Sequence, residues 1–457
     1  MRSKVSIALM GAVLATGLTA CSSSDDDNQQ FSNAGFIQFY NGSSNSAVTT
    51  IRGTEQTRIL GSSSYGDATT LFQVDGGFTE IEFFRTDSDD EEIILETREI
   101  DIPTGQKTLV MLTGDFGNPT FNEYRFNREE LEDHFRLFAV SVTDDQSSYD
   151  LYMSDSGAPF TAANLLGTIN YESFEEQTFW APDSDSEDFD EGSYTIYLTE
   201  PGSQEVIFES NTVSFQFATE YVLVIRGSSG AIQSGIEVDL ILNSSTVGNL
   251  DDIDASSQYR LYNSLDNDAV SIALDGTDVV TPAVELAANT LSGFTEVEFG
   301  DYRLSANSTT NAELTFNNRL VTLNQGESKA IVIYQDENDA LTSLSFDEST
   351  QPQVFDKQVV AANLVSDFTD VDLYFVRKDE TIESAQFLIA SIDFGEAKTV
   401  TLPSDFYELV AVFDDNEDTQ VLLDRTELLG LNEEANYIIM IEESLDSPTG
   451  YKISLLF

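Results

Sequence analysis

The chain has almost no cysteine, histidine or tryptophan, with one residue of each in 457 positions. A single cysteine excludes an intrachain disulfide framework and a cysteine-based zinc cluster, and a single histidine excludes a metal site built from several histidines. Lysine and arginine are also scarce, at 21 against 81 Asp and Glu, which gives a formal charge of −60. Such a chain repels phosphate backbones, so nucleic acid is not an expected partner, and no cofactor is expected.

Apolar residues are plentiful by contrast. The chain is 40% hydrophobic and 11% aromatic, which is enough to bury real cores and excludes disorder along the whole chain. Its length predicts three or four domains of roughly 100–150 residues each.

The first 21 residues have the pattern of a secretory signal. Arg2 and Lys4 precede an apolar stretch that is too short to span a membrane as a helix, and small residues follow it. The end of this segment, Leu18-Thr19-Ala20-Cys21, resembles the lipobox of bacterial lipoproteins. That resemblance implies cleavage after Ala20 and a diacylglycerol on Cys21. The alternative is an ordinary signal peptide, which would leave Cys21 as a free thiol.

Residues 21–33 are small, polar and acidic, so they are expected to form a tether. A serine directly after the cysteine resembles lipoproteins of the Gram-negative outer membrane, which predicts a lipid-anchored protein at its periplasmic face or on the cell surface. Removal of residues 1–20 takes away Arg2 and Lys4 and changes the charge from −60 to −62. Anionic headgroups would repel such a chain, so the acyl chains alone are expected to hold it.

Beyond the tether, apolar residues alternate with polar ones or form short runs rich in Val, Ile, Phe and Tyr, bounded by Gly, Asn, Asp and Ser. This pattern predicts β-strands, and we expect an all-β chain of tandem immunoglobulin-like β-sandwich repeats. The best helical segment is 127–136, where Asn127 can cap a first turn that contains acidic residues.

Two strand patterns recur along the chain. A strongly apolar late strand ends at Leu112, Ile225, Ile333 and Ile441, with spacings of 113, 108 and 108 residues. An opening strand ends at Asn41, Ala139, Asn263 and Asn363, with spacings of 98, 124 and 100 residues. Both patterns predict four β-sandwich units, at 34–126, 134–245, 257–350 and 356–457. Each unit is expected to have its own core and to fold alone, because the connectors 246–256 and 346–356 are polar.

Further strands keep their order within the units. A second strand recurs at 149–153, 270–274 and 371–375, and a middle strand recurs at 77–83, 192–198, 300–304 and 405–410. The near match between 77–83 and 293–299 falls at different places in the units and is interpreted as chance. This order resembles the bacterial domain-of-unknown-function family numbered 4397, which implies tandem β-sandwiches in secreted and lipid-anchored proteins and supplies no catalytic residue.

Candidates for catalysis are few. His134 lies in a charged connector and is interpreted as a solvated surface residue. The string Asp155-Ser156-Gly157-Ala158 resembles one loop of an aspartic protease, but that chemistry needs two such loops, so the string is interpreted as a turn. We therefore expect a non-catalytic, lipid-anchored envelope protein with a structural, adhesive or ligand-binding role, whose partners are envelope proteins or polysaccharide. The alternative is an extracytoplasmic carbohydrate-active hydrolase that uses a carboxylate pair.

Calcium is the metal that the acidic loops could hold, because it prefers hard oxygen ligands. Acidic clusters lie at 87–92, 183–191, 251–254 and 414–418. None completes an EF-hand: counted from Asp183, the sixth position is Asp188 and the twelfth is Tyr194. Solvated turns are the favoured interpretation, and a calcium-only increase in stability that depends on Asp183, Asp185 and Glu187 would contradict it.

Overall fold

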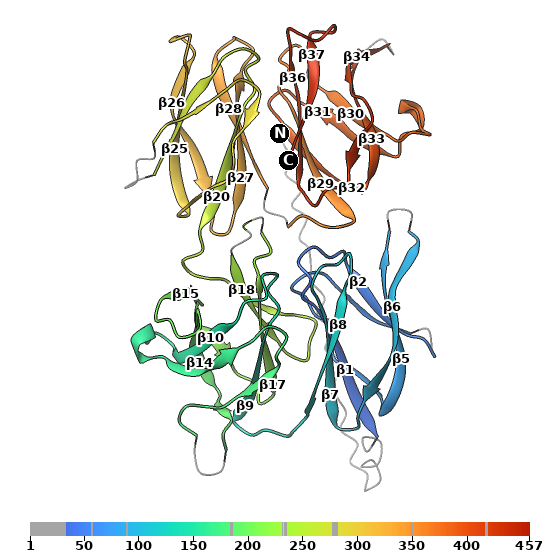
Figure 1. Ribbon diagram of the computed structural model, residues 1–457, viewed down its shortest axis with the longest axis vertical. Helices are drawn as coiled ribbons and strands as arrows, with labels where there is room; N and C mark the ends of the chain where they lie inside the picture. Colours follow the sequence, from blue (N-terminus) through green and yellow to red (C-terminus); the bar gives the residue numbers. More distant parts are fainter. Residues whose placement is uncertain are drawn as a thin grey trace, which may run out of the picture.

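The computed structural model describes residues 33–55, 58–87, 90–182, 186–230, 232, 235–276, 282–348, 351–415 and 419–457. Within these ranges the regular structure is β-strand, apart from two single turns of 3₁₀ helix, η2 (Phe160–Ala162) and η3 (Ile382–Ser384). The prediction of an all-β protein built from tandem β-sandwiches is confirmed. The strands form four groups, which we name sandwiches 1 to 4 (Figure 1).

Sandwich 1 contains β1 (Ala34–Asn41), β2 (Thr49–Gly53), β3 (Arg58–Ser63), β4 (Phe72–Asp75), β5 (Gly77–Thr86), β6 (Glu92–Ile102), β7 (Gln106–Thr113) and β8 (Thr120–Asn127). Sandwich 2 contains β9 (His134–Ser141), β10 (Tyr149–Asp155), β11 (Asn164–Ile169), β12 (Glu175–Gln177), β13 (Phe189–Asp190), β14 (Gly192–Thr199), β15 (Val206–Glu209), β16 (Val213–Phe215), β17 (Glu220–Gly227), β18 (Ile236–Ile241) and β19 (Gly248–Leu250).

Sandwich 3 contains β20 (Ser257–Asn263), β21 (Val270–Asp275), β22 (Val284–Leu286), β23 (Thr290–Leu291), β24 (Thr295–Val297), β25 (Gly300–Ser308), β26 (Thr315–Leu323), β27 (Ser328–Gln335) and β28 (Leu341–Asp347). Sandwich 4 contains β29 (Asp356–Asn363), β30 (Val371–Val376), β31 (Phe387–Ile392), β32 (Ala397–Pro403), β33 (Asp405–Asp415), β34 (Thr419–Arg425), β35 (Leu429–Leu431), β36 (Tyr437–Glu443) and β37 (Tyr451–Leu456).

All four sandwiches share one topology. In sandwich 1 the two sheets have the orders β4-β1-β7-β8 and β3-β2-β5-β6, and in sandwich 4 the corresponding orders are β32-β29-β36-β37 and β31-β30-β33-β34. The opening and late strands of each sandwich pair in parallel, as β1 with β7, β9 with β17, β20 with β27 and β29 with β36. The other pairings between named strands are antiparallel.

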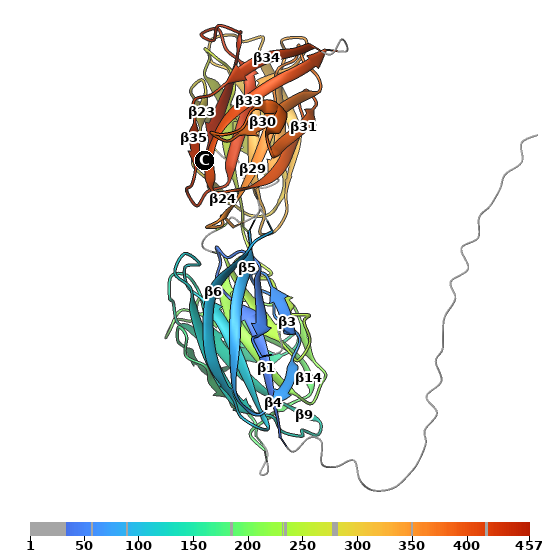
Figure 2. The ribbon, with the colours of Figure 1, turned by 90° about the vertical axis from the view of Figure 1, so that its right-hand side faces the viewer.

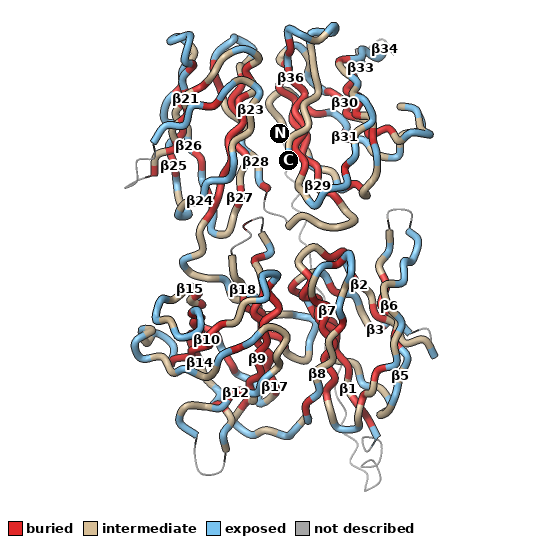
Figure 3. Tube along the Cα trace, viewed as in Figure 1, coloured by how far each residue is buried: buried red, intermediate tan, exposed pale blue. Residues whose placement is uncertain are grey.

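Each late strand contains a continuous apolar run, such as Leu109 to Leu112 in β7, and the residues of these runs are buried (Figure 3). In β7, Val110 and Leu112 belong to the core of sandwich 1, whereas Leu109 and Met111 face sandwich 2. In β36, Ile439 and Ile441 belong to the core of sandwich 4, whereas Ile438 and Met440 face sandwich 3. A strand that is buried on both faces has a continuous apolar run instead of alternation.

The sandwiches therefore associate in pairs. Sandwiches 1 and 2 share one apolar cluster that includes Tyr40, Met111 and Val224, and sandwiches 3 and 4 share another that includes Tyr262, Val332 and Met440. Figures 1 and 2 show the two pairs stacked end to end, with sandwiches 1 and 2 below sandwiches 3 and 4. Tyr262 lies 222 positions after Tyr40, so the pair is itself a repeating element.

A tyrosine near the start of the middle strand recurs in three of the sandwiches. The hydroxyl of Tyr194 donates to the carbonyl of Asp190 at 2.7 Å, and that of Tyr407 donates to the carbonyl of Pro403 at 2.9 Å. Tyr302 makes the same bond to Glu298. A tyrosine that ties its strand to backbone a few residues upstream is a feature of immunoglobulin-like sandwiches.

A buried asparagine ends three of the opening strands. The side chain of Asn363 donates to the carbonyls of Phe368 and Ile392 and accepts from the backbone of Val365. Asn263 makes the same three bonds in sandwich 3, Asn41 makes the bonds to Ser63 and Ser43 in sandwich 1, and all three asparagines are fully buried. Each asparagine therefore fixes the loop between the opening and second strands.

Three sequence interpretations can be compared directly with the structure. The predicted helix at 127–136 is wrong: β9 begins at His134, where Phe135, Leu137 and Ala139 alternate into the core of sandwich 2. The near match at 293–299 is chance, because β5 pairs with β2 whereas β24 pairs with β20. The interpretation of 246–256 as a polar connector is incomplete, because this segment contains β19, which pairs with β18.

The connector between sandwiches 3 and 4 contacts the lower pair, and we name residues 351–355 the strap. Val354 and Phe355 pack against the core of sandwich 1. The ring of Phe355 lies edge-on to Phe116, with centroids 5.8 Å apart, and the guanidinium carbon of Arg85 lies 4.0 Å from the centroid of that ring. Gln351 donates to the carbonyl of Ser228 at 2.8 Å, so the strap also reaches sandwich 2.

Candidate functional site

His134 and the Asp155 string lie on different strands of sandwich 2. His134 lies on β9, where Nε2 is 3.2 Å from the carboxylate of Asp190 and Nδ1 is 2.7 Å from the carbonyl of Glu132. Asp155 ends β10, and its carbonyl accepts from the backbone of Ala158 at 3.1 Å. The interpretation of the Asp155 string as a turn is confirmed.

Among the described residues of the acidic clusters, those of 251–254 and Asp87 lie in loops, whereas Glu92 begins β6, Asp190 ends β13, and Asp414 and Asp415 end β33. The carboxylate of Asp87 accepts from the backbone of Glu91, and that of Asp252 accepts from the backbones of Glu209 and Asp254. Across the described ranges, no three or more His, Cys, Asp or Glu residues are grouped so that they could hold a metal ion. Asp183 and Asp185 lie outside the described residues, and so does Cys21, the predicted lipidation site.

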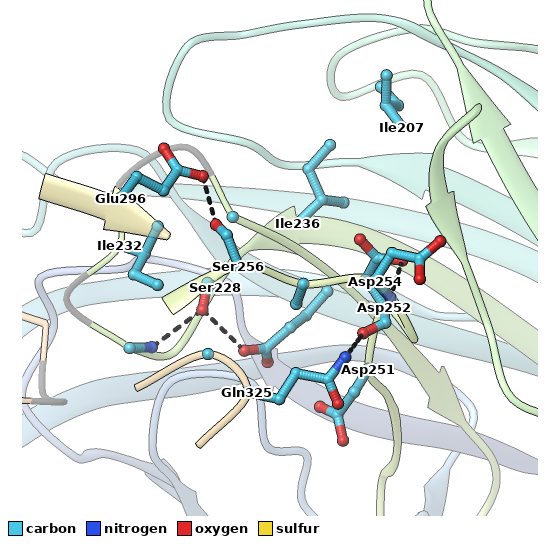
Figure 4. A pocket seen from close by; sticks show the side chains of 15 residues that line it. Ile207, Ser228, Ile232, Ile236, Asp251, Asp252, Asp254, Ser256, Glu296 and Gln325 are labelled. Atoms are coloured by element: carbon cyan, nitrogen blue, oxygen red, sulfur yellow. Dashed lines mark hydrogen bonds between the residues drawn. The ribbon is translucent and has the colours of Figure 1, made fainter. Parts of the chain in front are cut away.

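Two adjoining cavities lie where the upper and lower pairs meet. The smaller, of about 400 Å³, is bordered by β18, the connector 251–256 and sandwich 3 (Figure 4). In it, Gln325 donates to the carbonyl of Asp252 at 2.5 Å and Ser256 donates to Glu296, so the connector is tied to sandwich 3. The larger cavity, of about 970 Å³, is bordered by sandwiches 1, 2 and 4 and by the strap. Ile207, Gly235 and Ile236 border both cavities.

The carboxyl groups of the smaller cavity differ in their affinity for protons. Burial raises the pKa of Asp251, and the negative charge of Glu237 raises it further. Burial alone would raise the pKa of Glu237 too, but the charge of Arg226 and hydrogen bonds from Asn249, Ser229 and Ser228 lower it. Burial also raises the pKa of Asp252, so the cavity presents two carboxyls that hold their protons more tightly than usual and one, Glu237, that holds its proton less tightly.

The larger cavity takes its polar groups from loops that are far apart in sequence. Asp144 and Asp145 come from the turn after β9, Asp115 follows β7, and Glu434 precedes β36. The amide of Asn45 donates to Asp115 at 3.1 Å and to Glu434 at 2.9 Å, which links the lower pair to the upper one. Burial raises the pKa of Asp144, and the charges of Asp145 and Glu434 add to this effect.

A buried ionic network lies behind both cavities, between sandwiches 1 and 2. Arg226 donates to both carboxylate oxygens of Asp239, at 2.7 and 3.1 Å, and the hydroxyl of Tyr40 donates to the same carboxylate at 2.6 Å. Arg226 also lies 2.6 Å from Glu237. In the upper pair, Tyr262 donates to the buried carboxylate of Glu442 at 2.9 Å. The opening-strand tyrosine of the first sandwich therefore bonds to an acid of the second sandwich in both pairs.

Sequence reasoning did not single out Arg226, Asp239 or the residues of the larger cavity. The one available signal was the charge of Arg226 directly after the apolar run of β17. The cavity residues belong to no motif, and only the folded chain brings their loops together. Among the described residues of the acidic clusters predicted from sequence, only those of 251–254 border either cavity.

The described residues contain no helix with the length and apolar character needed to cross a membrane. No protein-family model matches the chain, and no curated protein sequence matches it significantly. A solved structure from Bacteroides ovatus ATCC 8483, provisionally described as a cell adhesion protein, is similar over 49% of this chain and 99% of its own, with 9% identity and a TM-score of 0.23. A TM-score this low carries no argument about function. The fold itself defines the class, a protein of tandem β-sandwiches.

Proposed function

We propose that the chain is a non-catalytic lipoprotein of the Gram-negative outer membrane, anchored by diacylglycerol on Cys21, whose body binds a ligand or an envelope component. Its sandwiches would then be divergent members of the family numbered 4397. The tether of residues 21–33 would separate the acyl chains from the first strand, which begins at Ala34.

The observation that carries the binding role is the position of the larger cavity. Its walls come from three sandwiches and the strap, and shared apolar clusters join those sandwiches in pairs. A cavity of this volume between rigid elements is the usual form of a ligand site. The loops that carry its polar groups start and end on strands of these packed sandwiches, which limits the positions the groups can take before a ligand arrives.

The anchor is tested by replacing the cysteine. Cys21→Ser should move the protein from the membrane fraction to the soluble fraction and abolish labelling by a palmitate analogue. Ser22→Ala is the matched control and should leave both unchanged. Retention of Cys21→Ser in the membrane would refute the lipid anchor.

One observation favours the alternative, a carbohydrate-active hydrolase. Glu237 and Asp251 border the same small cavity, and their pKa values are shifted in opposite directions. A general acid and a carboxylate partner need this difference. Under this alternative, Asp251→Asn and Glu237→Gln would each abolish the release of reducing sugar from a glycan substrate without abolishing its binding.

A further inference from the structure

The larger cavity differs from an apolar pocket in the chemistry of its walls. Carboxylates of Asp115, Asp144, Asp145, Glu200 and Glu434 border it, and among the described residues no lysine or arginine does. The other side chains are hydroxyls, amides and the rings of Tyr149 and Tyr171, with few aliphatic residues. The walls therefore offer many hydrogen-bond acceptors, together with donors on tyrosine, serine and glutamine.

This chemistry restricts the ligand. An anionic ligand would face five carboxylates, and Lys357, whose charge interacts with that of Glu434, is not among the described residues that border the cavity. An apolar ligand would bury polar groups without partners, which is costly. A molecule rich in hydroxyl groups matches both the acceptors and the donors of the cavity wall, because each hydroxyl can donate to a carboxylate and accept from a phenol or an amide.

We propose that the larger cavity binds a neutral polyhydroxylated ligand, a short segment of uncharged glycan. The inference rests on the proposed function and names the ligand class of its site. The volume of about 970 Å³ lies at the upper end of ordinary ligand pockets, which suits several sugar rings. The partly exposed ring of Tyr171 provides a surface on which a sugar ring can pack, whereas the ring of Tyr149 is buried in the core of sandwich 2.

The position of the cavity adds a mechanical effect to binding. Asp144 and Tyr171 belong to the lower pair, Glu434 belongs to sandwich 4, and Gln351 belongs to the strap. A glycan that contacts all of them links the upper pair to the lower pair. Binding therefore also stabilises the interface between the upper and lower pairs.

The test begins with the full chain on an array of neutral, amino and uronic-acid glycans. The strongest neutral binder is then titrated calorimetrically against the wild-type chain and the variants Asp144→Ala, Tyr171→Ala and Tyr171→Phe. Glu296→Ala, in the smaller cavity, is the matched control for loss of an acidic cavity residue. We expect at least tenfold weaker binding for Asp144→Ala and Tyr171→Ala, a smaller loss for Tyr171→Phe, and less than a twofold change for Glu296→Ala. Thermal unfolding of each variant reports whether it has folded.

Three results would overturn the inference: no neutral glycan binds, binding is unchanged in folded Asp144→Ala and Tyr171→Ala, or Glu296→Ala loses as much affinity as they do. Binding of spermine in place of glycans would make the cavity a cation site and would also overturn it. The anchor is measured separately by fractionation of Cys21→Ser. Glycan binding can therefore fail while the lipoprotein stands, and the anchor can fail while glycan binding stands.

Discussion

Lys107 is a buried cation that forms no salt bridge among the described residues. It lies on β7 between sandwiches 1 and 2, where its ammonium nitrogen is 3.2 Å from the side-chain oxygen of Asn243 and 3.4 Å from the carbonyl of Leu242. Burial lowers its pKa from 10.5 to about 7, against a smaller opposing effect of Glu220. The charged form of Lys107 therefore destabilises the folded chain.

Replacement of Lys107 by methionine should stabilise the protein in a pH-dependent way. Below about pH 7 both folded and unfolded wild-type chains carry the proton, so the cost of the buried charge is at its full value. Between pH 7 and 10.5 the unfolded chain binds more protons, so wild-type stability rises with pH. Lys107→Met should thus gain roughly 1–3 kcal/mol near pH 6 and lose that advantage by pH 10. Denaturant unfolding at pH 6 and pH 10 checks this prediction, and an equal gain in stability at both pH values would contradict it.

Asn363 tests the loop after the opening strand. Asn363→Ala should destabilise the chain by about 1–3 kcal/mol, because it leaves two buried carbonyls and one backbone amide without their partner. Asn338 is exposed, so Asn338→Ala should change stability by less than about 0.5 kcal/mol. Equal effects of the two substitutions on chemical denaturation would show that the buried bonds contribute nothing.

At the scale of elements, the sequence predicted the existence of strands better than their partners. The late strands were recognised from their apolar runs, such as Leu109 to Leu112, but the runs do not show which face meets which neighbour. Only the structure shows that Val110 faces its own core and Met111 faces sandwich 2. The predicted helix failed because the acids before His134 resemble a helical first turn, whereas Phe135 and Leu137 alternate as a strand.

The cavities were beyond prediction for a related reason. Asn45, Asp144 and Glu434 are separated by about a hundred residues or more, and each lies in an ordinary polar loop. No spacing within a unit reports a site that forms between units. Asp251 and its neighbours were noticed because they are consecutive in sequence, not because the pattern revealed a cavity.

The strap is the element whose removal should separate the pairs. Phe355→Ala removes a ring that packs on Phe116 and Arg85, and should cost about 2–4 kcal/mol while loosening the upper pair from the lower one. Small-angle scattering should then show a broader range of dimensions. Phe299 is 50% exposed, so Phe299→Ala is a control that should leave scattering and stability nearly unchanged. Identical scattering from Phe355→Ala and the wild-type chain would show that other contacts hold the two pairs together.

At the scale of the whole molecule, the pair replaces the single unit as the expected folding unit. A fragment covering 257–350 alone would expose Tyr262, Ala330, Val332 and Tyr334, which face sandwich 4 in the intact chain. We expect 257–457 to unfold cooperatively at a higher temperature than 257–350, and 257–350 to self-associate through its exposed face. Calorimetry and sedimentation check this prediction. If 257–350 were monomeric and had the same Tm as 257–457, each sandwich would be an independent folding unit.

The charge of −60 makes the chain repel itself, and 0.1 M salt screens this repulsion between charges more than about 10 Å apart. Sodium chloride should therefore raise the Tm by relieving self-repulsion, and calcium should add little beyond magnesium at equal ionic strength. Thermal unfolding in matched ionic strength checks this. A large increment seen with calcium alone, and lost when Asp183, Asp185 and Glu187 are made neutral, would indicate specific sites.

The pairing of sandwiches also limits how such a chain can evolve in length. Loss or gain of one sandwich by recombination would leave an apolar face such as that of Val332 and Tyr334 without cover. Loss or gain of a pair, 222 residues as measured from Tyr40 to Tyr262, leaves every such face covered. Homologous genes should therefore differ by even numbers of sandwiches, so that the heritable module is twice the size of the structural repeat.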